Sequence, residues 1–481
     1  MSDRFQPMPV ENMLTWILHE FENRNSIFGI HSNLFFHPKL DDLFTMERYG
    51  RRLQTPIGVA AGPHSQLAQN IVAAWLCGAR YIELKTIQTL DELEISKPCI
   101  DMEDEGYNCE WSQELKLRQS FEEYLNAWII IHILTDKFGW ETSKDPSMIF
   151  NMSAGYDLKG ILNDNVQDFF NLMENAHVQL SEKLERLETV YPHINQVDIP
   201  SQISDNLTIS TMHGCPPDEI ERIGRYFIKE RNYHTTIKLN PTLLGQDHLR
   251  NILHNELNFQ NVIVPDEAFE HDLKFDDAVA LIENLTDLAK IHGVHFGLKL
   301  TNTLEVKNVK HIFPEKESMS YLSGRALHPI SINVAAKLQE KFNGKLDISF
   351  SAGVDAFNVP DVLACNIKPV TTCTDLLKPG GYTRLQQYLI EISSRFRQTG
   401  AKNIDDYICN TADEAGNPGS AGLRNLKNYA GSVVNHPGYQ SRIDSFENIK
   451  THRKLTEFDC IQAPCTENCA TDQEIPQYMY H

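Results

Sequence analysis

The sequence lacks every feature that would place it in or across a membrane. Its 481 residues contain no uninterrupted run of roughly 18 apolar residues, the length that a helix needs to span a bilayer. The most apolar stretch, residues 127–134, is far shorter. The N-terminus has no basic segment followed by an apolar core, so we expect no signal peptide. We also expect no membrane partner and a cytoplasmic location.

Positive charge is also scarce. The chain has 44 Lys and Arg against 65 Asp and Glu, which gives a net charge of −21. This balance argues against nucleic acid as a partner, because binding to phosphate backbones depends on clustered cations. Acidity does not identify a substrate, since it is shared by many cytoplasmic enzymes.

Cysteine is used sparingly along most of the chain. Seven of the ten cysteines are scattered, and the remaining three lie close together near the C-terminus. Scattered cysteines are typical of reduced thiols rather than of a disulfide framework. The chain also has no low-complexity tract.

The chain does contain a regular alternation of strand-like and helix-like segments. Eight short runs are typical of strands, and each is followed by polar or glycine residues and then by a helix-like stretch. The runs are Pro56–Ala61, Arg80–Leu84, Met148–Ser153, Leu207–Thr211, Thr235–Leu239, His295–Leu300, Asp347–Ser351 and Pro369–Cys373. This pattern predicts a (β/α)8 TIM barrel of the α/β class, with its active site at the C-terminal ends of the strands.

The barrel accounts for only part of the chain, so we expect additional segments. The expected divisions are an N-terminal extension (1–50), the barrel (51–398), a polar, loop-like connector (399–458) and a cysteine-containing tail (459–481). The extension should contain a helix over Glu11–Glu22, and further helices are expected over Asp218–Arg231 and Val359–Cys365. Long insertions over 87–145 and 245–275 should lie at the active-site end of the barrel.

The tail carries three closely spaced thiols. Cys460, Cys465 and Cys469 follow a C-x4-C-x3-C spacing, and soft thiolates are the usual ligands of iron–sulfur clusters. Three unrelated cysteines, or a zinc site with a distant fourth ligand, are alternatives. No fourth ligand is evident, which suggests a piece of a longer polypeptide or a subunit whose 4Fe–4S cluster is completed elsewhere.

Several motifs resemble, in order along the chain, the flavin barrels of dihydroorotate dehydrogenase and dihydropyrimidine dehydrogenase. The matching segments are 55–62 (TPIGVAAG), 83–86 (ELKT), 107–112 (YNCEWS), 213–216 (HGCP), 236–241 (TIKLNP), 301–303 (TNT), 321–324 (YLSG), 351–354 (SAGV) and 370–373 (VTTC). The resemblance covers about residues 55–395 and implies an FMN-dependent oxidoreductase that acts on a C=C or CH–CH bond. The pyrimidine enzymes have an asparagine where this chain has Met212, so the resemblance does not extend to uracil itself.

A closer resemblance is to the family named "putative selenate reductase subunit" (YgfK type). It implies that a glutamate-synthase-like module with iron–sulfur clusters, FAD and a nicotinamide site follows the barrel, and residues 460–476 resemble the start of that module. The glutamate-synthase pattern has a further cysteine at the position of Glu457. The glycine motifs for FAD and nicotinamide do not occur in this chain, so the module would be supplied in cis or in trans. A homodimer is compatible with the sequence.

The resemblance and the chemistry of the residues together predict a flavin site. Lys85 and Lys238 lie at strand ends, where an ammonium group can stabilise the negative charge of a reduced flavin. Lys299 lies at a third strand end without a supporting motif, and we interpret it as a solvated strand tip. Glycine and threonine suit phosphate binding. The predicted FMN-binding residues are Ala60, Ala61, Gly62, Lys85, Thr86, Asn151, Lys238, Ser323, Gly324, Ala352, Gly353, Thr371 and Thr372.

The predicted catalytic group is the thiol of Cys215. Reduction of a polarised C=C bond needs a hydride on one carbon and a proton on its neighbour, and Cys215 lies in the loop after the fourth strand. His213 could orient or shuttle this proton, although an ordinary loop histidine is the simpler interpretation. Amide, carboxylate and hydroxyl side chains predicted to bind a small-molecule substrate are Asn108, Glu110, Asn240, Asn302 and Thr303.

These observations predict an FMN-dependent oxidoreductase barrel that acts on a small planar nitrogen heterocycle or unsaturated amide and exchanges electrons with a separate iron–sulfur and FAD module. A flavin-free lyase or isomerase that uses Cys215 as an acid or base is one alternative. A non-catalytic scaffold subunit for electron transfer is another. Bound flavin would exclude the flavin-free lyase or isomerase. A substrate-dependent oxidation or reduction of that flavin would exclude the non-catalytic scaffold.

Overall fold

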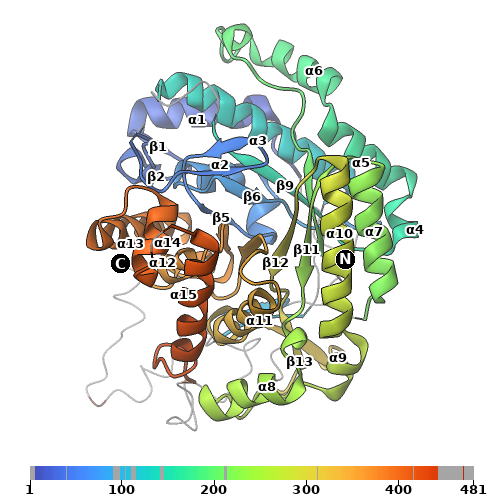
Figure 1. The fold of residues 1–481 in the computed structure, drawn as a ribbon. Helices are drawn as coiled ribbons and strands as arrows, with labels where there is room; N and C mark the ends of the chain where they lie inside the picture. Colours follow the sequence, from blue (N-terminus) through green and yellow to red (C-terminus); the bar gives the residue numbers. More distant parts are fainter. Residues whose placement is uncertain are drawn as a thin grey trace.

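The structure is a computed structural model. This structure describes residues 6–39, 41–89, 98–102, 105–109, 115–140, 146–210, 214–310, 313–414, 416–441 and 470. A closed barrel of eight parallel strands lies at the centre, with helices around it (Figure 1). Its strands are β5 (Ile57–Val59), β6 (Tyr81–Glu83), β9 (Ile149–Ala154), β10 (Asn206–Ser210), β11 (His234–Leu239), β12 (Phe296–Leu300), β15 (Ile348–Phe350) and β16 (Val370–Thr372).

The strands follow one another around the barrel in chain order, and β16 closes it by pairing with β5. Each strand coincides with one of the eight predicted runs, so the predicted fold class is confirmed. The strands are buried on both sides, as expected when helices cover the outside of a parallel sheet. Their apolar composition therefore reflects two buried faces rather than one.

Helices connect successive strands and form the outer layer. The main connecting helices are α2 (Ala68–Leu76), α3 (Leu117–Phe138), α5 (Asp164–Glu174), α7 (Pro217–Lys229), α10 (Phe275–His292), α11 (Leu327–Lys341) and α12 (Val359–Ala364), and α13 (Arg384–Thr399) follows the last strand. The helices expected at 218–231 and 359–365 correspond to α7 and α12. The helix expected at 11–22 is α1 (Val10–Arg24), which packs beside α6 (His177–Leu187).

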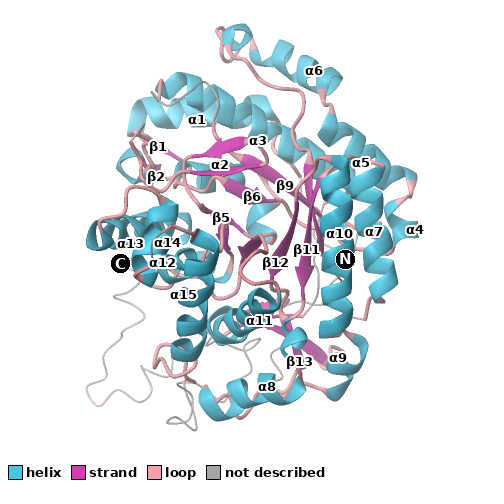
Figure 2. Cartoon of the chain, in the orientation of Figure 1, coloured by secondary structure: helices cyan, strands magenta, loops and turns pink. Residues whose placement is uncertain are grey.

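The two predicted insertions differ in content. The region 87–145 contains the barrel helix α3, so only the part before it is an insertion, and that part includes β7 (Ile100–Asp101) and β8 (Gly106–Asn108). These strands join β13 (Leu304–Lys307) and β14 (Met319–Ser323) in a four-stranded sheet of order β13-β14-β8-β7. The second insertion holds α8 (Gln246–Arg250) and α9 (Asp266–His271). In Figure 2 strands β11 and β12 point toward the end of the molecule where α8, α9 and β13 lie.

A small hairpin closes the opposite end of the barrel. Strands β3 (Met46–Arg48) and β4 (Arg51–Leu53) are joined by Tyr49 and Gly50, which both have positive φ angles (54° and 71°). Two residues with positive φ are the requirement of the type I′ turn, whose twist matches that of antiparallel strands. A second hairpin pairs β1 (Ser26–Ile27) with β2 (Ile30–His31).

The expectation of a loop-like connector at 399–458 is wrong over much of its length. Residues 404–412 and 418–433 form helices α14 (Ile404–Ala412) and α15 (Pro418–Val433), which contact α12 and α11 of the barrel. The sequence of α15 is mostly polar and contains several glycines, but its buried residues, which include Leu426 and Val433, form an apolar stripe along the helix. Asn417 caps α15 by accepting hydrogen bonds from the backbone N–H of Gly419 (2.8 Å) and Ser420 (3.4 Å). No helix among the described residues is both long and apolar enough to cross a bilayer.

Candidate functional site

A cavity of about 1220 Å³, including the space at its open mouth, lies at the C-terminal ends of the barrel strands. Residues at or just past the ends of β5, β6, β10, β11, β12, β15 and β16 line it, and β8 and β14 contribute one side. Parallel strands of a barrel all end at the same face, which is why residues distant in sequence meet here. The predicted location of the site thus coincides with a real cavity.

All but one of the thirteen residues predicted to bind FMN line this cavity. The exception is Asn151 of β9, which is fully buried inside the barrel. Its amide donates to Asn206 Oδ1 (2.8 Å) and accepts from the hydroxyl of Thr208 (2.6 Å). The side chain of Asn151 therefore serves a polar network among neighbouring strands, because a buried amide must find hydrogen-bond partners inside the protein.

The floor of the cavity contains a buried ion pair. Lys299 Nζ binds Glu83 Oε1, and the two side chains are 1% and 2% exposed. The hydroxyl of Thr371 accepts from Lys299 (2.5 Å) and donates to Glu83 (2.8 Å). The other carboxylate oxygen of Glu83 accepts from the N–H of Ala61 (3.4 Å), a residue of the cavity wall. Lys299 is therefore not the solvated strand tip that its sequence context suggested.

Two further lysines, Lys85 and Lys238, line the cavity itself. Burial lowers the pKa of Lys238 below its ordinary value, and the nearby carboxylate of Glu83 opposes that shift. Burial raises the pKa of Glu83, but the ammonium groups of Lys299 and Lys238 and the hydrogen bonds outweigh it, so the pKa lies below its ordinary value. Glu83 is thus ionised, and its one carboxylate interacts with buried Lys299 and half-buried Lys238, while Lys85 lines the same cavity.

Two glycines form a close crossing of loops on one wall. Gly353 (φ 55°) lies so near the backbone of Gly324 (φ 75°) that a Cβ on Gly353 would meet the Gly324 carbonyl oxygen at 2.2 Å. Asn358 Nδ2 donates to the Gly353 carbonyl (2.9 Å), and the hydroxyls of Thr372 (3.1 Å) and Tyr388 (2.9 Å) donate to the Val354 carbonyl. The loop after β15 is therefore held in one shape, with its backbone against the cavity.

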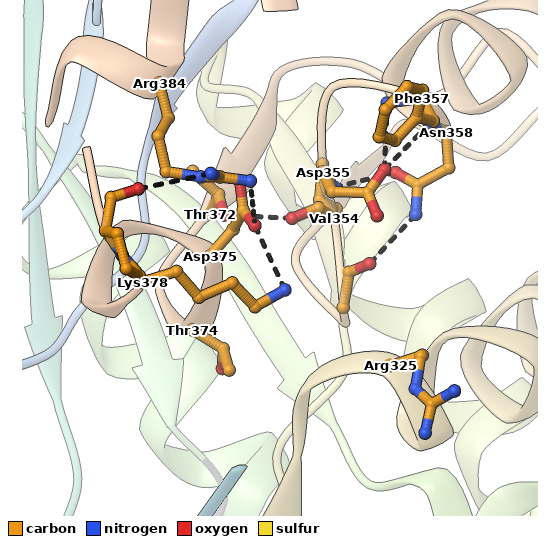
Figure 3. Close-up of polar contacts among 12 residues, drawn as sticks. Arg325, Val354, Asp355, Phe357, Asn358, Thr372, Thr374, Asp375, Lys378 and Arg384 are labelled. Atoms are coloured by element: carbon orange, nitrogen blue, oxygen red, sulfur yellow. Dashed lines mark hydrogen bonds and ion pairs between the residues drawn. The ribbon is translucent and has the colours of Figure 1, made fainter. Parts of the chain in front are cut away.

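Charged residues surround this loop on the outer side (Figure 3). Arg384 binds the Asp375 carboxylate through two nitrogens (2.9 Å each), and Lys378 lies 3.2 Å from the same carboxylate. Asp355 caps the start of α12 by accepting from the N–H of Phe357 (2.9 Å) and Asn358 (3.1 Å). These contacts fix the loop after β15, which contains Gly353, and the loop that directly follows the threonine pair at the end of β16.

The side chains predicted to bind substrate are partly brought together. Asn108, Asn302 and Thr303 line the cavity. Asn240 is not among the described lining residues, but its Oδ1 accepts from Nδ2 of Asn302 (2.6 Å), so it orients that amide. Glu110 lies outside the described residues. Amides and hydroxyls on one side of a cavity can both donate to and accept from a planar ring.

Cys215 lies apart from the described lining of the cavity. It follows Gly214 at the start of α7 and is half-buried, and Ser210 of the same strand end does line the cavity. Burial and then the carboxylates of Glu219, Asp218 and Asp157 raise the pKa of the thiol to about 11. The thiol is therefore neutral at physiological pH and carries a proton. His213 lies outside the described residues, as do Cys460, Cys465 and Cys469.

Sequence reasoning missed three groups at the site. Glu83 and Lys299 are charges of opposite sign inside otherwise apolar strands, and that signal could have identified them, since buried charges occur in pairs. Cys373 also lines the cavity, and its Sγ lies 3.5 Å from Nδ1 of buried His64. Burial lowers the pKa of His64 to about 4, so this imidazole is neutral. Nothing in the sequence relates His64 to Cys373, because they are 309 positions apart.

Comparison with known proteins places the chain in a family. A family model described as "Oxidoreductase YgfK, N-terminal TIM-barrel domain" matches residues 28–417. The chain belongs to this family. Proteins named "Putative oxidoreductase YgfK" from Escherichia coli strains K12 and O157:H7 are each 40% identical to it over 503 aligned residues. The match covers 100% of this chain but 46% of each relative, so the chain spans about half the length of the curated relatives it matches.

The fold also occurs among solved structures. The crystal structure of DHODH from Eimeria tenella in complex with ferulenol aligns with 84% of this chain and 96% of its own, with a TM-score of 0.50 and 16% identity. At that identity the likeness concerns the fold alone. The YgfK family membership and the barrel are thus shown, and the chemistry must be argued from the site.

Proposed function

We propose that this chain is the FMN-dependent oxidoreductase barrel of a longer flavoprotein. The observation that carries the proposal is one cavity that combines half-buried lysines with a glycine-lined backbone wall. Lys238 and Lys85 provide positive charge. Gly324 and Gly353 let their two loops cross closely, so that backbone rather than side chains forms this wall of the cavity. A flavin mononucleotide needs both features, because its ring system becomes negatively charged on reduction and its other end is a phosphate.

The walls of the cavity support FMN. Lys85, Lys238, Gly324 and Gly353 all line this one cavity, so a ligand with a ring system at one end and a phosphate at the other could contact both the lysines and the glycine wall. The threonine hydroxyls already have hydrogen-bond partners inside the protein. The hydroxyl of Thr371 bonds with Glu83 and Lys299. The hydroxyl of Thr372 bonds with the Val354 carbonyl and the hydroxyl of Tyr388. Backbone N–H groups of this wall would therefore contribute more to holding the phosphate than the hydroxyls that the sequence pointed to.

When bound, FMN supplies hydride transfer, and the chain supplies position and a proton. Asn108, Asn302 and Thr303 would bind a planar nitrogen heterocycle or unsaturated amide in the same cavity. The contact from Asn240 fixes the orientation of the Asn302 amide. Cys215 would give the proton that reduction of a C=C bond requires, consistent with a thiol that stays protonated at neutral pH.

Electrons would come from a module outside the barrel. The tail cysteines Cys460, Cys465 and Cys469 would ligate a 4Fe–4S cluster that is completed by residues beyond this chain or by a partner chain. The curated relatives are about twice as long as this chain, which leaves room for such a module in cis. An FAD and nicotinamide site in that module would supply the reducing equivalents.

Substrate-driven redox change of the flavin tests the function. Protein loaded with FMN and reduced anaerobically would be mixed with a series of planar nitrogen heterocycles and unsaturated amides, and the flavin absorbance followed by stopped flow. At least one compound should reoxidise the flavin faster than a compound-free control. If every compound leaves the rate at the control value although FMN is bound, the chain is a scaffold rather than an enzyme.

The variant Cys215→Ser tests the proton donor in the same experiment. It should leave FMN affinity unchanged and slow reoxidation by the active compound by roughly two to four powers of ten, the usual effect of losing a general acid. Cys409→Ser, a half-buried cysteine of α14 far from the barrel strands in sequence, is the matched control and should not change the rate. An unchanged rate in Cys215→Ser would remove Cys215 from the mechanism.

A further inference from the structure

The floor of the cavity buries more charge than the proposed flavin contacts need. Lys238 and Lys85 already provide the cations that line the cavity. Below them, Glu83 and Lys299 form a nearly fully buried ion pair. Burying such a pair costs desolvation free energy that its own attraction often fails to recover, so an apolar pair would serve packing as well or better. The position of this pair beneath the cavity calls for a role other than stability.

The contacts show how the pair reaches the cavity. Glu83 Oε1 receives Lys299 and the hydroxyl of Thr371, whereas Oε2 faces the N–H of Ala61 in the cavity wall. Lys238 is close enough for its charge to lower the pKa of Glu83, and Glu83 in turn raises that of Lys238. Charges in a site of low dielectric interact strongly over several ångströms, so a change in the pair is felt at Lys238 and in the cavity.

This inference rests on the proposed function: we propose that Glu83 and Lys299 are positioning residues that together set the net charge beneath the bound flavin. Removing Glu83 alone leaves the ammonium groups of Lys299 and Lys238 without their shared counter-charge. Removing Lys299 alone leaves a carboxylate facing the flavin with less compensation. Removing both keeps the net charge of the floor unchanged.

The surrounding charges determine how this floor responds to pH. Lys299 faces Glu83 from β6, Lys238 from β11 and the hydroxyl of Thr371 from β16, and the charge of Arg48 in the hairpin also acts on it. Burial lowers the pKa of Lys299 to about 8, and Glu83 opposes this shift. The positive charge of Lys299 is therefore complete only well below pH 8 and is lost as pH rises through that value. Affinity for anionic FMN should fall over the same range.

The test is the reduction potential of bound FMN at pH 6, measured by dye equilibration in this chain and in Glu83→Gln, Lys299→Met and the double variant. A positive floor favours the reduced flavin, which carries negative charge. Glu83→Gln should raise the reduction potential and Lys299→Met should lower it. Each variant should change the ratio of the affinities for reduced and oxidised FMN about tenfold, which corresponds to about 30 mV for a two-electron couple. The double variant should return to the wild-type value.

The opposite shifts of the two single variants are what a purely structural role would not produce. Single variants that shift in the same direction, or a double variant that departs further from wild type than either single one, would overturn the inference. If Glu83→Gln does not fold, Lys299→Met compared with the double variant still decides, because only charge compensation restores the potential. Wild-type protein that binds no FMN would overturn the proposed function as well, whereas FMN binding without charge-dependent shifts would overturn this inference alone.

Discussion

Each end of the barrel holds an ion pair, but the two pairs differ in burial and in surroundings: Asp347 at the hairpin end is 35% exposed, whereas both partners at the cavity end are almost fully buried. At the N-terminal end, Arg48 of the β3–β4 hairpin binds Asp347 (3.1 Å) and lies over the ring of Tyr49 (4.8 Å), and His295 binds the same carboxylate. At the C-terminal end, Glu83 binds Lys299 below the cavity. Each carboxylate thus faces two basic groups, but only the second pair lies under a ligand-sized space.

The difference lies in what surrounds each pair. The hairpin end is closed by Tyr49, whose ring stacks on His234 (4.6 Å, 5° between planes) at the start of β11. The cavity end adds a third cation, Lys85, and has no aromatic ring covering the pair among the described contacts. We conclude that the hairpin pair joins the barrel to its N-terminal extension, while the cavity pair belongs to ligand binding. Variants at the two ends should therefore affect different measurements.

The largest expected effect is on stability, at the hairpin end. Arg48→Met should lower the free energy of unfolding by about 3 kcal/mol, because Asp347 loses its main partner while remaining partly enclosed. Urea denaturation measures the change. FMN affinity of the folded fraction should stay within about twofold of wild type.

Arg52→Met is the matched control, since Arg52 lies in the same hairpin but is exposed. It should change the unfolding free energy by less than about 0.5 kcal/mol. If Arg48→Met weakens FMN binding as strongly as it lowers stability, the two ends are not independent and the comparison fails.

The next effect concerns the glycine wall. Gly353→Ala should lower the unfolding free energy by about 2 kcal/mol and abolish FMN retention, because its Cβ would collide with the Gly324 carbonyl at 2.2 Å. Gly381→Ala shares the positive φ (50° against 55°) but has nothing within 4 Å of its Cβ. The control should cost about 1 kcal/mol and retain FMN. Equal FMN affinity in the two variants would show that the loop crossing does not shape the cofactor site.

The smallest effect concerns one cavity cation. Lys238→Met should weaken FMN binding about tenfold at pH 7, since an ion-assisted hydrogen bond contributes about 1.5 kcal/mol or more. The lowered pKa of Lys238 means that its ammonium is lost at a lower pH than in a free lysine. Wild-type affinity should therefore decline in the alkaline range below pH 10.5, and the decline should be weaker in the variant. Fluorescence titration measures both, with exposed Lys229→Met as the unchanged control.

The sequence predicted what depends on local pattern, and missed what depends on contacts between distant segments. The strands and most cavity residues followed from apolar runs and the residues just past them, because the geometry of a barrel brings strand ends together. The Glu83–Lys299 pair and the Cys373–His64 contact join positions 216 and 309 residues apart, which no local pattern encodes.

The errors have the same origin. Asn151 lies in the middle of β9 rather than at its end, and its side chain turns to Asn206 and Thr208 within the barrel. Helices α14 and α15 were missed because the polar and glycine residues around them were interpreted as a loop, although the buried residues Ile404, Tyr407, Ile408 and Ala412 of α14 recur at helical spacing. The stability of these two helices depends on packing against α11 and α12. Tyr49 at a positive φ gave no turn signal, because bulky residues rarely adopt that conformation without contacts such as the one with His234.

The most direct measurement is an FMN titration of the purified 481-residue chain, followed by flavin fluorescence and by the absorption spectrum of the complex. The account predicts saturable binding of one FMN per chain, unchanged in Arg52→Met and lost in Gly353→Ala. A chain that is folded by circular dichroism but stays colourless after incubation with excess FMN would contradict it.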